Sequence, residues 1–187
     1  MFDGSQWGAM PEPMPDPATA PFSPAMAFDS SSGVLLVAST VNMEPTSMEA
    51  NILMRTYDGS EWNGEWLPPA FSAKGVNPSL ICGFVGEVES SVFNSFLFWE
   101  DRSTTPASIR YMNLLAEVPS YDEFANGEEP TAAIYNGDLF LSYVKDGTLV
   151  YRTYDGIVWS EENPYGAMPE PMPHPTHPSM NVGAIPE

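Results

Sequence analysis

The chain has 187 residues, of which 25 are acidic and 6 are basic, so its formal charge at neutral pH is −19. Nucleic acids and anionic membrane surfaces are bound through basic side chains, and we expect this chain to be repelled by both. Hydrophobic residues make up 43% of the sequence, which is enough to build a core, yet no apolar run approaches the roughly 20 residues that span a bilayer. We therefore predict one folded domain with no nucleic-acid partner and no membrane insertion.

A sequence pattern recurs along the chain at intervals of about 50 residues. The pattern Arg-Thr-Tyr-Asp-Gly-x-x-Trp occupies residues 55–62 and again 152–159, and residues 2–7 carry a shortened copy, Phe-Asp-Gly-Ser-Gln-Trp. A proline followed by a short apolar segment also recurs, at Pro24, Pro78, Pro130 and Pro178. Repeats of this length are typical of arrays and propellers, in which each unit buries its apolar face against neighbouring units.

Each complete module contains the same segments in the same order. The Pro-led segment is followed by a stronger apolar run, then by a segment that contains an arginine, and then by a segment around or just after a tryptophan. These runs are short, rich in β-branched and aromatic residues and broken by Gly, Asn, Asp and Pro, so each is predicted to be a strand. The Pro-led segments are 24–28, 78–82, 130–134 and 178–182, the apolar runs are 33–37, 94–99 and 137–143, and the arginines are Arg55, Arg110 and Arg152.

The third module gives the clearest strand boundaries, and the second gives the weakest. Asn136-Gly137 and Asp146-Gly147 each predict a tight hairpin turn on either side of one strand. In the second module the segment 109–113 is not followed by Asp-Gly, and the nearest aromatic equivalents are Tyr121 and Phe124.

Four-stranded units of about 40–50 residues are typical of β-propeller blades, so the predicted fold is an all-β propeller. We expect a single propeller-type domain over residues 1–187, with a blade end at 1–16, blades at about 17–70, 71–125 and 126–170, and the start of a further blade at 171–187. Propellers have roughly four to eight blades, so three complete blades are too few to close a ring. A homo-oligomer is therefore predicted, most simply a dimer in which two chains form one propeller of about six to eight blades.

The Asp-Gly-x-x-Trp corner, the arginine on the preceding strand and the Pro-led strand resemble blades of carbohydrate-binding β-propeller lectins, including the fungal and bacterial fucose-binding type. The resemblance implies monosaccharide pockets between neighbouring blades, formed typically by an Arg, a Glu and a Trp or Tyr. No Glu occupies one consistent place in all three modules, so the sugar stays open. The candidate sugar-binding residues are Arg55, Arg110, Arg152, Trp7, Trp62, Trp99 and Trp159.

The chemistry of these residues supports two interpretations. A sugar ring packs its apolar C–H face on an aromatic ring, and the planar guanidinium of arginine donates to adjacent hydroxyls. The tryptophans can instead be packing wedges between blades, and an arginine close to Asp58 or Asp155 can pair with that carboxylate.

A second similarity is to the Asp-box of sialidase-like propellers, seen at residues 56–62, although the family has one residue between Asp and Gly and this chain has none. No complete catalytic set can be assigned. The predicted function is multivalent glycan binding without catalysis. The alternatives are a sialidase-like glycoside hydrolase or lyase, and a propeller scaffold for protein partners.

No cofactor and no metal site are predicted. The chain lacks the spaced Asp ligands of a calcium loop, and both histidines, His174 and His177, lie in a Pro-rich stretch. Cys82 is the single cysteine, which excludes an intrachain disulfide. No basic region followed by an apolar segment is visible at the N-terminus, which favours a cytoplasmic or non-classically secreted protein.

Overall fold

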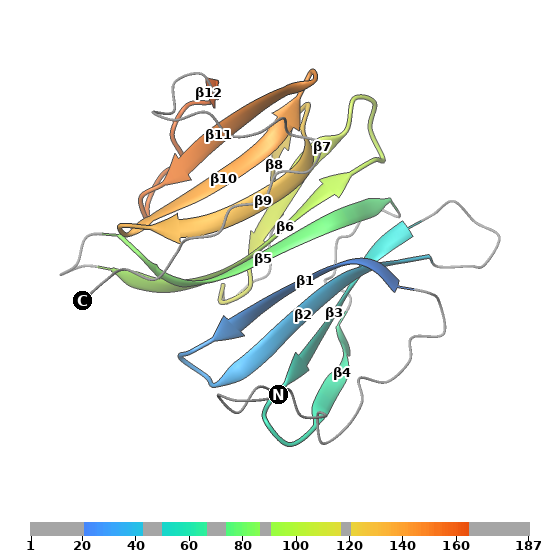
Figure 1. The fold of residues 1–187 in the computed structure, drawn as a ribbon, viewed down its shortest axis with the longest axis vertical. Helices are drawn as coiled ribbons and strands as arrows, with labels where there is room; N and C mark the ends of the chain where they lie inside the picture. Colours follow the sequence, from blue (N-terminus) through green and yellow to red (C-terminus); the bar gives the residue numbers. More distant parts are fainter. Residues whose placement is uncertain (1–20, 43–49, 67–73, 87–90, 117–120, 165–187) are drawn as a thin grey trace, which may run out of the picture.

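The computed structural model describes residues 21–42, 50–66, 74–86, 91–116 and 121–164. These residues form twelve β-strands in three four-stranded antiparallel sheets (Figure 1) and contain no helix. Accordingly, this part of the chain contains no helix of the length and apolarity needed to cross a membrane. The all-β prediction is confirmed, whereas Trp7, the 1–16 segment, the Pro178 segment and both histidines lie outside the described residues.

Each sheet is a simple meander in which every strand pairs with the next one in sequence. Sheet 1 contains β1 (Pro21–Asp29), β2 (Val34–Asn42), β3 (Ala50–Tyr57) and β4 (Trp62–Trp66). Sheet 2 contains β5 (Gly75–Val85), β6 (Val92–Asp101), β7 (Ser108–Asn113) and β8 (Tyr121–Ala125). Sheet 3 contains β9 (Glu128–Tyr135), β10 (Asp138–Lys145), β11 (Thr148–Tyr154) and β12 (Asn163–Pro164).

The two hairpin turns predicted in the third module are confirmed by their backbone angles. Asn136 and Gly137 have φ values of 51° and 85°, and Asp146 and Gly147 have values of 51° and 73°. Two successive residues with positive φ make the type I′ turn that matches the twist of the flanking strands. Gly137 also touches sheet 2, where the N–H of Gly86 donates to its carbonyl oxygen at 2.8 Å.

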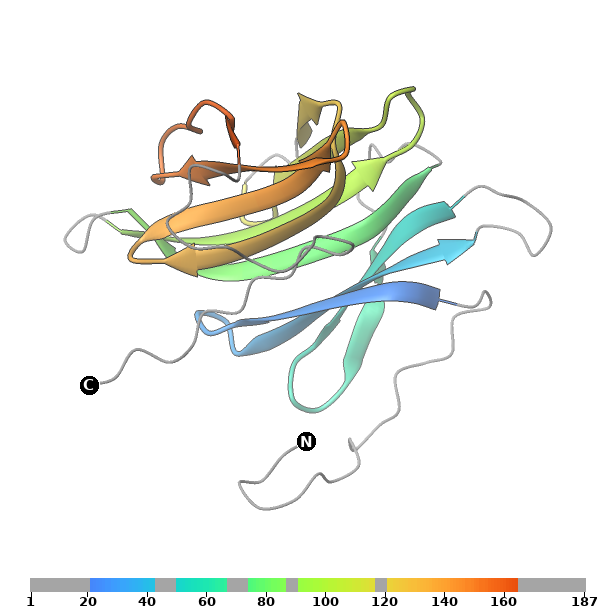
Figure 2. The same ribbon diagram turned by 45° about the horizontal axis from the view of Figure 1, so that its top comes forward.

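The three sheets are stacked in chain order, with β1 beside β5 and β5 beside β9 (Figures 1 and 2). Because side chains alternate along a strand, sheet 2 presents one face to sheet 1 and the other to sheet 3. The first interface packs Leu36, Ala38, Ile52 and Met54 against Leu80, Leu97, Trp99 and Met112. The second packs Val85, Phe96, Phe98 and Ile109 against Leu139, Leu141, Tyr143 and Val150.

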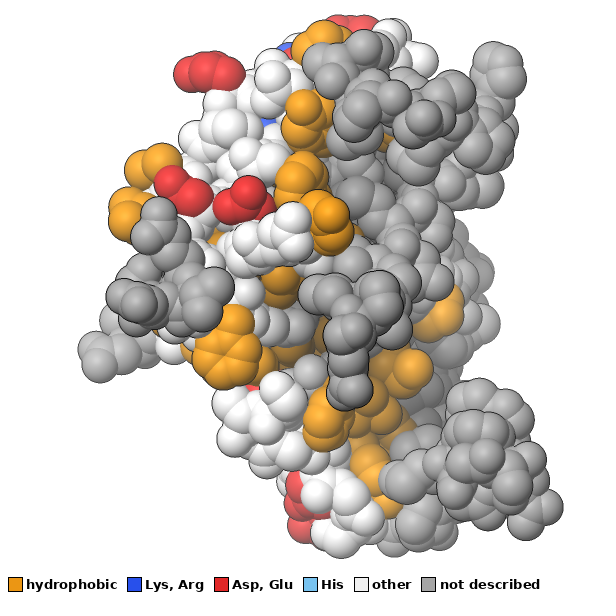
Figure 3. Space-filling model, turned by 60° about the vertical axis from the view of Figure 1, so that its left-hand side comes forward, with side chains coloured by type: hydrophobic (Ala, Val, Ile, Leu, Met, Phe, Trp, Pro, Cys, Tyr) orange, Lys and Arg blue, Asp and Glu red, His pale blue; other side chains and the backbone are white. Residues whose placement is uncertain are grey.

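The described residues form an open stack of sheets and close no ring, so propeller closure stays a prediction. Apolar side chains also reach the surface, among them Met26 and Phe28, which are 66% and 59% exposed. Figure 3 shows hydrophobic side chains in an interrupted band on one face, with acidic side chains beside it.

One irregularity occurs at the same place in all three sheets. The residue before each Pro of the Pro-led strands has a positive φ, which is 49° at Ser23, 51° at Asn77 and 51° at Glu129. At each place two residues of the first strand lie opposite one residue of the second, which is a β-bulge. A bulge accommodates the missing N–H of proline and redirects the preceding side chain. Each such non-glycine residue costs of the order of 1–3 kcal/mol, which the surrounding packing must offset.

Candidate functional site

The repeated Tyr-Asp-Gly-x-x-Trp motif forms the turn between the third strand and the segment that follows it. In the first copy, Asp58 Oδ1 accepts hydrogen bonds from the N–H groups of Ser60 and Glu61 at 2.8 and 2.9 Å. In the second, Asp155 Oδ1 accepts from the N–H groups two and three residues later, also at 2.8 and 2.9 Å. The backbone hydrogen bonds from Glu61 and Ser60 lower the pKa of Asp58 to about 2. The aspartates therefore act as charged acceptors within the turn.

The aromatic residues of the motif complete the same turn. Tyr57 Oη donates to the Gly59 carbonyl at 2.9 Å, and Tyr154 Oη donates to the Gly156 carbonyl at 3.0 Å. The ring centroids of Tyr57 and Trp62 lie 5.2 Å apart. Local folding of the turn thus accounts for the repetition of these residues without any ligand.

Two of the candidate tryptophans are part of the packing between sheets. Trp99 is 1% exposed in the interface of sheets 1 and 2, so it presents no face to a ligand. The Trp159 ring packs edge-on against Phe98, Tyr111 and Phe124, with centroids 5.2–6.0 Å apart, and therefore bridges sheets 2 and 3.

The three candidate arginines do not occupy one repeat position. Arg55 pairs with Val37, which pairs with Met26 on the next strand. Arg152 pairs with Leu141, which pairs with Ala132. Met26 and Ala132 each stand two residues after the proline of their strand. In sheet 2 the residue at that position, Leu80, is aligned through Leu97 with Met112. Met112 therefore occupies the position of Arg55 and Arg152 in sheet 2, and Arg110 lies two residues before it.

Arg152 is held between sheets 2 and 3 by several groups. Its Nε donates to Tyr143 Oη at 3.1 Å, its Nη1 donates to the Ser160 carbonyl at 2.8 Å, and its guanidinium lies 4.7 Å from the centroid of the Phe124 ring. Tyr143 in turn donates to Glu162 at 2.7 Å. Desolvation, with the hydrogen bond to Glu162, raises the pKa of Tyr143 to about 12. These contacts link β8, β10, β11 and the segment before β12.

The other two arginines lie in different surroundings. Arg110 Nε forms ion pairs with Asp101 Oδ2 at 2.8 Å and with Glu123 Oε2 at 3.5 Å, and its guanidinium covers the Tyr121 ring at 4.6 Å. Arg55 is buried, and the alternation along β3 directs it to the face of sheet 1 opposite Met54, which packs on sheet 2. The structure therefore does not bring the three arginines together.

A pocket of about 290 Å³ lies between sheets 1 and 2. We call it the inter-sheet pocket. Its polar walls include Thr56 and Ser95, and its apolar walls include Leu36 and Leu114. The full lining is Asp29, Leu36, Met54, Arg55, Thr56, Ser95, Leu114 and Leu115.

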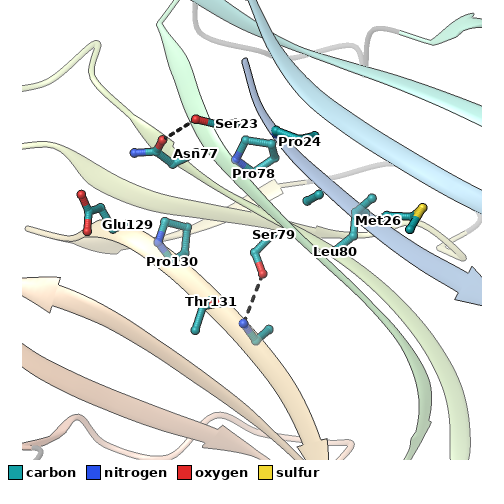
Figure 4. A pocket seen from close by; sticks show the side chains of 12 residues that line it. Ser23, Pro24, Met26, Asn77, Pro78, Ser79, Leu80, Glu129, Pro130 and Thr131 are labelled. Carbon is teal, nitrogen blue, oxygen red and sulfur yellow. Dashed lines mark hydrogen bonds between the residues drawn. The ribbon is translucent and has the colours of Figure 1, made fainter. Parts of the chain in front are cut away.

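A larger pocket, of about 500 Å³, lies where the beginnings of the three Pro-led strands come together (Figure 4). We call it the Pro-strand pocket. Each sheet contributes four consecutive residues in equivalent positions, which begin at the positive-φ residue. The lining residues are Ser23, Pro24, Ala25, Met26, Asn77, Pro78, Ser79, Leu80, Glu129, Pro130, Thr131 and Ala132.

The polar groups of the Pro-strand pocket are linked across the sheets. Ser23 Oγ donates to Asn77 Oδ1 at 3.2 Å, and Asn77 Nδ2 donates to Glu100 Oε2 at 2.9 Å. The same Glu100 oxygen accepts from the N–H of Glu129 at 3.2 Å. Glu100 is 1% exposed, and its other oxygen contacts Arg102 Nε. A buried carboxylate on β6 therefore ties together the bulges of β5 and β9.

The sequence predicts the Pro-led strands but not the pocket that they form. A signal was present, because the residue before each of these prolines is polar. Because Ser23, Asn77 and Glu129 differ chemically, the sequence alone does not indicate that they occupy equivalent positions. No group of three or more His, Cys, Asp or Glu side chains within the described ranges could hold a metal ion.

No family model and no curated protein matches the sequence. Among solved structures, the chain is similar to "Hadza microbial sialidase Hz136", with a TM-score of 0.46 and 15% sequence identity. The similarity covers 76% of this chain and 33% of that one, so the chain spans about a third of that protein's length.

The contacts of Arg152 predict a structural effect of substitution. Arg152→Lys should lower the free energy of unfolding by about 1–2 kcal/mol, because a lysine cannot reach Tyr143 Oη and the Ser160 carbonyl together. Urea denaturation monitored by tryptophan fluorescence measures the change. Unchanged stability together with loss of sugar binding would instead make Arg152 a ligand-binding residue.

Proposed function

We propose that this chain is a carbohydrate-binding protein without catalytic activity, and that a sugar binds in the Pro-strand pocket. The proposal rests on the three equivalent bulges, which bring a hydroxyl, an amide and a carboxylate to one pocket. Its other walls are the proline rings, Met26 and Leu80. Sugars carry closely spaced hydroxyls on rings with apolar C–H faces, so they match a site that combines a few convergent polar groups with apolar walls.

The alternative of a glycoside hydrolase is less well supported by the pocket. Most glycosidases use two carboxyl groups about 5–9.5 Å apart on either side of the scissile bond. Glu129 is the one carboxylate among the described lining residues. A cluster of arginines is also missing there, since Arg55, Arg110 and Arg152 point into separate regions. This composition favours binding over turnover.

The inter-sheet pocket is proposed as a second, weaker sugar site. It combines the hydroxyls of Thr56 and Ser95 with leucine side chains. Two modest sites on one chain raise the avidity for a glycan-coated surface without any new contact.

We further propose that the stacked sheets are blades of a propeller completed by a second copy of the chain. One face of sheet 2 is covered by sheet 1, and one face of sheet 3 is covered by sheet 2. The equivalent face of sheet 1 carries the exposed side chains of Met26 and Phe28. A sheet from a second copy would cover these side chains as sheet 1 covers sheet 2.

Light scattering coupled to size exclusion tests this assembly. We expect twice the chain mass of 20.5 kDa at micromolar concentrations. Phe28→Ser should shift the protein towards the monomer, because it removes apolar area from the proposed interface. A wild-type monomer across this range would contradict the assembly.

Matched threonine substitutions test the sugar site. Thr131→Val should weaken binding to the best ligand of a glycan array by about two- to tenfold, because it removes one lining hydroxyl at nearly constant volume. Thr56→Val removes a hydroxyl from the inter-sheet pocket and should have a smaller effect, whereas Thr153→Val, outside both pockets, serves as the control.

The outcomes separate the candidate functions. Sugar binding without hydrolysis of labelled glycosides supports the proposal, and hydrolysis supports the enzyme. An absence of both would favour a scaffold for protein partners. Loss of binding in Thr56→Val alone would move the main sugar site to the inter-sheet pocket.

A further inference from the structure

A chain of hydrogen bonds connects all three sheets at the Pro-strand pocket. Asn77, at the bulge of β5, makes three of the links. Its N–H donates to Thr40 Oγ1 of sheet 1 at 3.2 Å, its Oδ1 accepts from Ser23 Oγ at 3.2 Å, and its Nδ2 donates to Glu100 Oε2 at 2.9 Å. The same Glu100 oxygen accepts from the N–H of Glu129 in sheet 3 at 3.2 Å. Ser23 and Asn77 line the pocket (Figure 4), whereas Glu100 is 1% exposed and lies outside the lining.

Glu100 sets the direction of the side-chain hydrogen bonds in this chain. The Glu129 N–H contacts Oε2 and the Arg102 guanidinium contacts Oε1, and because both groups can only donate, both carboxylate oxygens are acceptors. The Asn77 amide therefore turns its NH₂ group to Glu100 and its oxygen to Ser23, as Figure 4 shows for the oxygen. The single hydroxyl hydrogen of Ser23 is used in this bond, so Ser23 Oγ offers only lone pairs to a ligand.

We propose that Glu100 is a positioning residue of the sugar site. Through Asn77 it fixes Ser23 as a hydrogen-bond acceptor, and the pocket thereby selects a sugar with a donating hydroxyl at that point. This inference rests on the carbohydrate-binding function proposed above. A serine hydroxyl that is free to rotate can donate or accept, so it discriminates little between ligand groups. Once its direction is fixed, a ligand group that cannot donate leaves Ser23 Oγ without a partner, which costs affinity.

Calorimetry with modified sugars tests this selectivity. The probes are the methyl glycosides of glucose, galactose, mannose and fucose, and the one that binds best is compared with its monodeoxy and monofluoro analogues at each hydroxyl. A fluorine has nearly the size of a hydroxyl but cannot donate. At one ring position we expect the deoxy and the fluoro analogue both to bind about five- to tenfold more weakly than the parent. In Ser23→Ala the parent should lose a similar factor, and these three sugars should bind alike.

Three variants on β6 separate positioning from stability. Glu100→Met removes both acceptors at similar length, so the affinity for the parent sugar should fall about five- to tenfold, with discrimination lost at the ring position that Ser23→Ala identifies. Glu100→Gln keeps one acceptor oxygen for the two N–H donors, and Arg102, which is 57% exposed, can turn to solvent, so affinity should stay within about twofold. Asn94→Leu is the matched control, because buried Asn94 accepts from the Asn113 amide at 3.1 Å and lies outside both pocket linings. It should lower the melting temperature and leave the affinity unchanged.

The Asn77 side chain gives a readout that needs no sugar. Its NH₂ protons should exchange with water several-fold faster in Glu100→Met than in the wild type, because their acceptor is removed. The NH₂ protons of Asn113 should be unaffected, since their acceptor is Asn94. NMR of isotope-labelled protein measures both amides in one experiment.

The results separate this inference from the proposed function. The inference is overturned, and carbohydrate binding left in place, if no ring position loses its discrimination in Ser23→Ala or if Glu100→Met changes neither discrimination nor Asn77 exchange. A fluoro analogue that binds as well as its parent at the Ser23 position, or equal losses of affinity in Glu100→Met and Asn94→Leu, also overturns it. The Ser23→Ala series decides even when Glu100→Met does not fold. Failure of all four glycosides to bind contradicts the proposed function itself.

Discussion

The apolar packing on both faces of sheet 2 is the interaction on which the other described features depend. Neighbouring residues of β6, such as Leu97 and Phe98, point to opposite faces, and both are 0% exposed. A strand buried on both sides cannot shift its register by one residue without exchanging its two apolar faces. The fixed register of sheet 2 in turn holds β1 and β9 on either side of β5. The Pro-strand pocket exists because these three strands are held together.

Local turns and long-range packing have separate roles in this fold. The Asp58 and Asp155 turns satisfy their polar groups within a few residues, so they can form before the sheets pack. The bulges before the prolines are different, because non-glycine residues at positive φ need support from outside. Glu100 supplies such support by bonding the Asn77 side chain and the Glu129 N–H. The hydrogen bonds that support these bulges also fix the groups that face the pocket.

Much of the fold could be predicted from the sequence because its signals are local. Short apolar runs predict the strands, and Asn136-Gly137 and Asp146-Gly147 predict the hairpins. The site could not be predicted in the same way. The burial of Trp99 and the two-residue displacement of Arg110 depend on pairing between strands, which the repeat alone does not specify. The Pro-strand pocket joins residues that lie about 50 positions apart in sequence, so it becomes visible only once the sheets are stacked.

We propose that the repeat is a scaffold and that the residues before the prolines contact the ligand. Hydrogen–deuterium exchange with and without saturating sugar tests this most directly, because amide protection reports on each strand separately. The account predicts slower exchange at the beginnings of β1, β5 and β9 together, near Ser23, Asn77 and Glu129. Protection confined to the turns around Asp58 and Asp155, or to the outer strands, would contradict it.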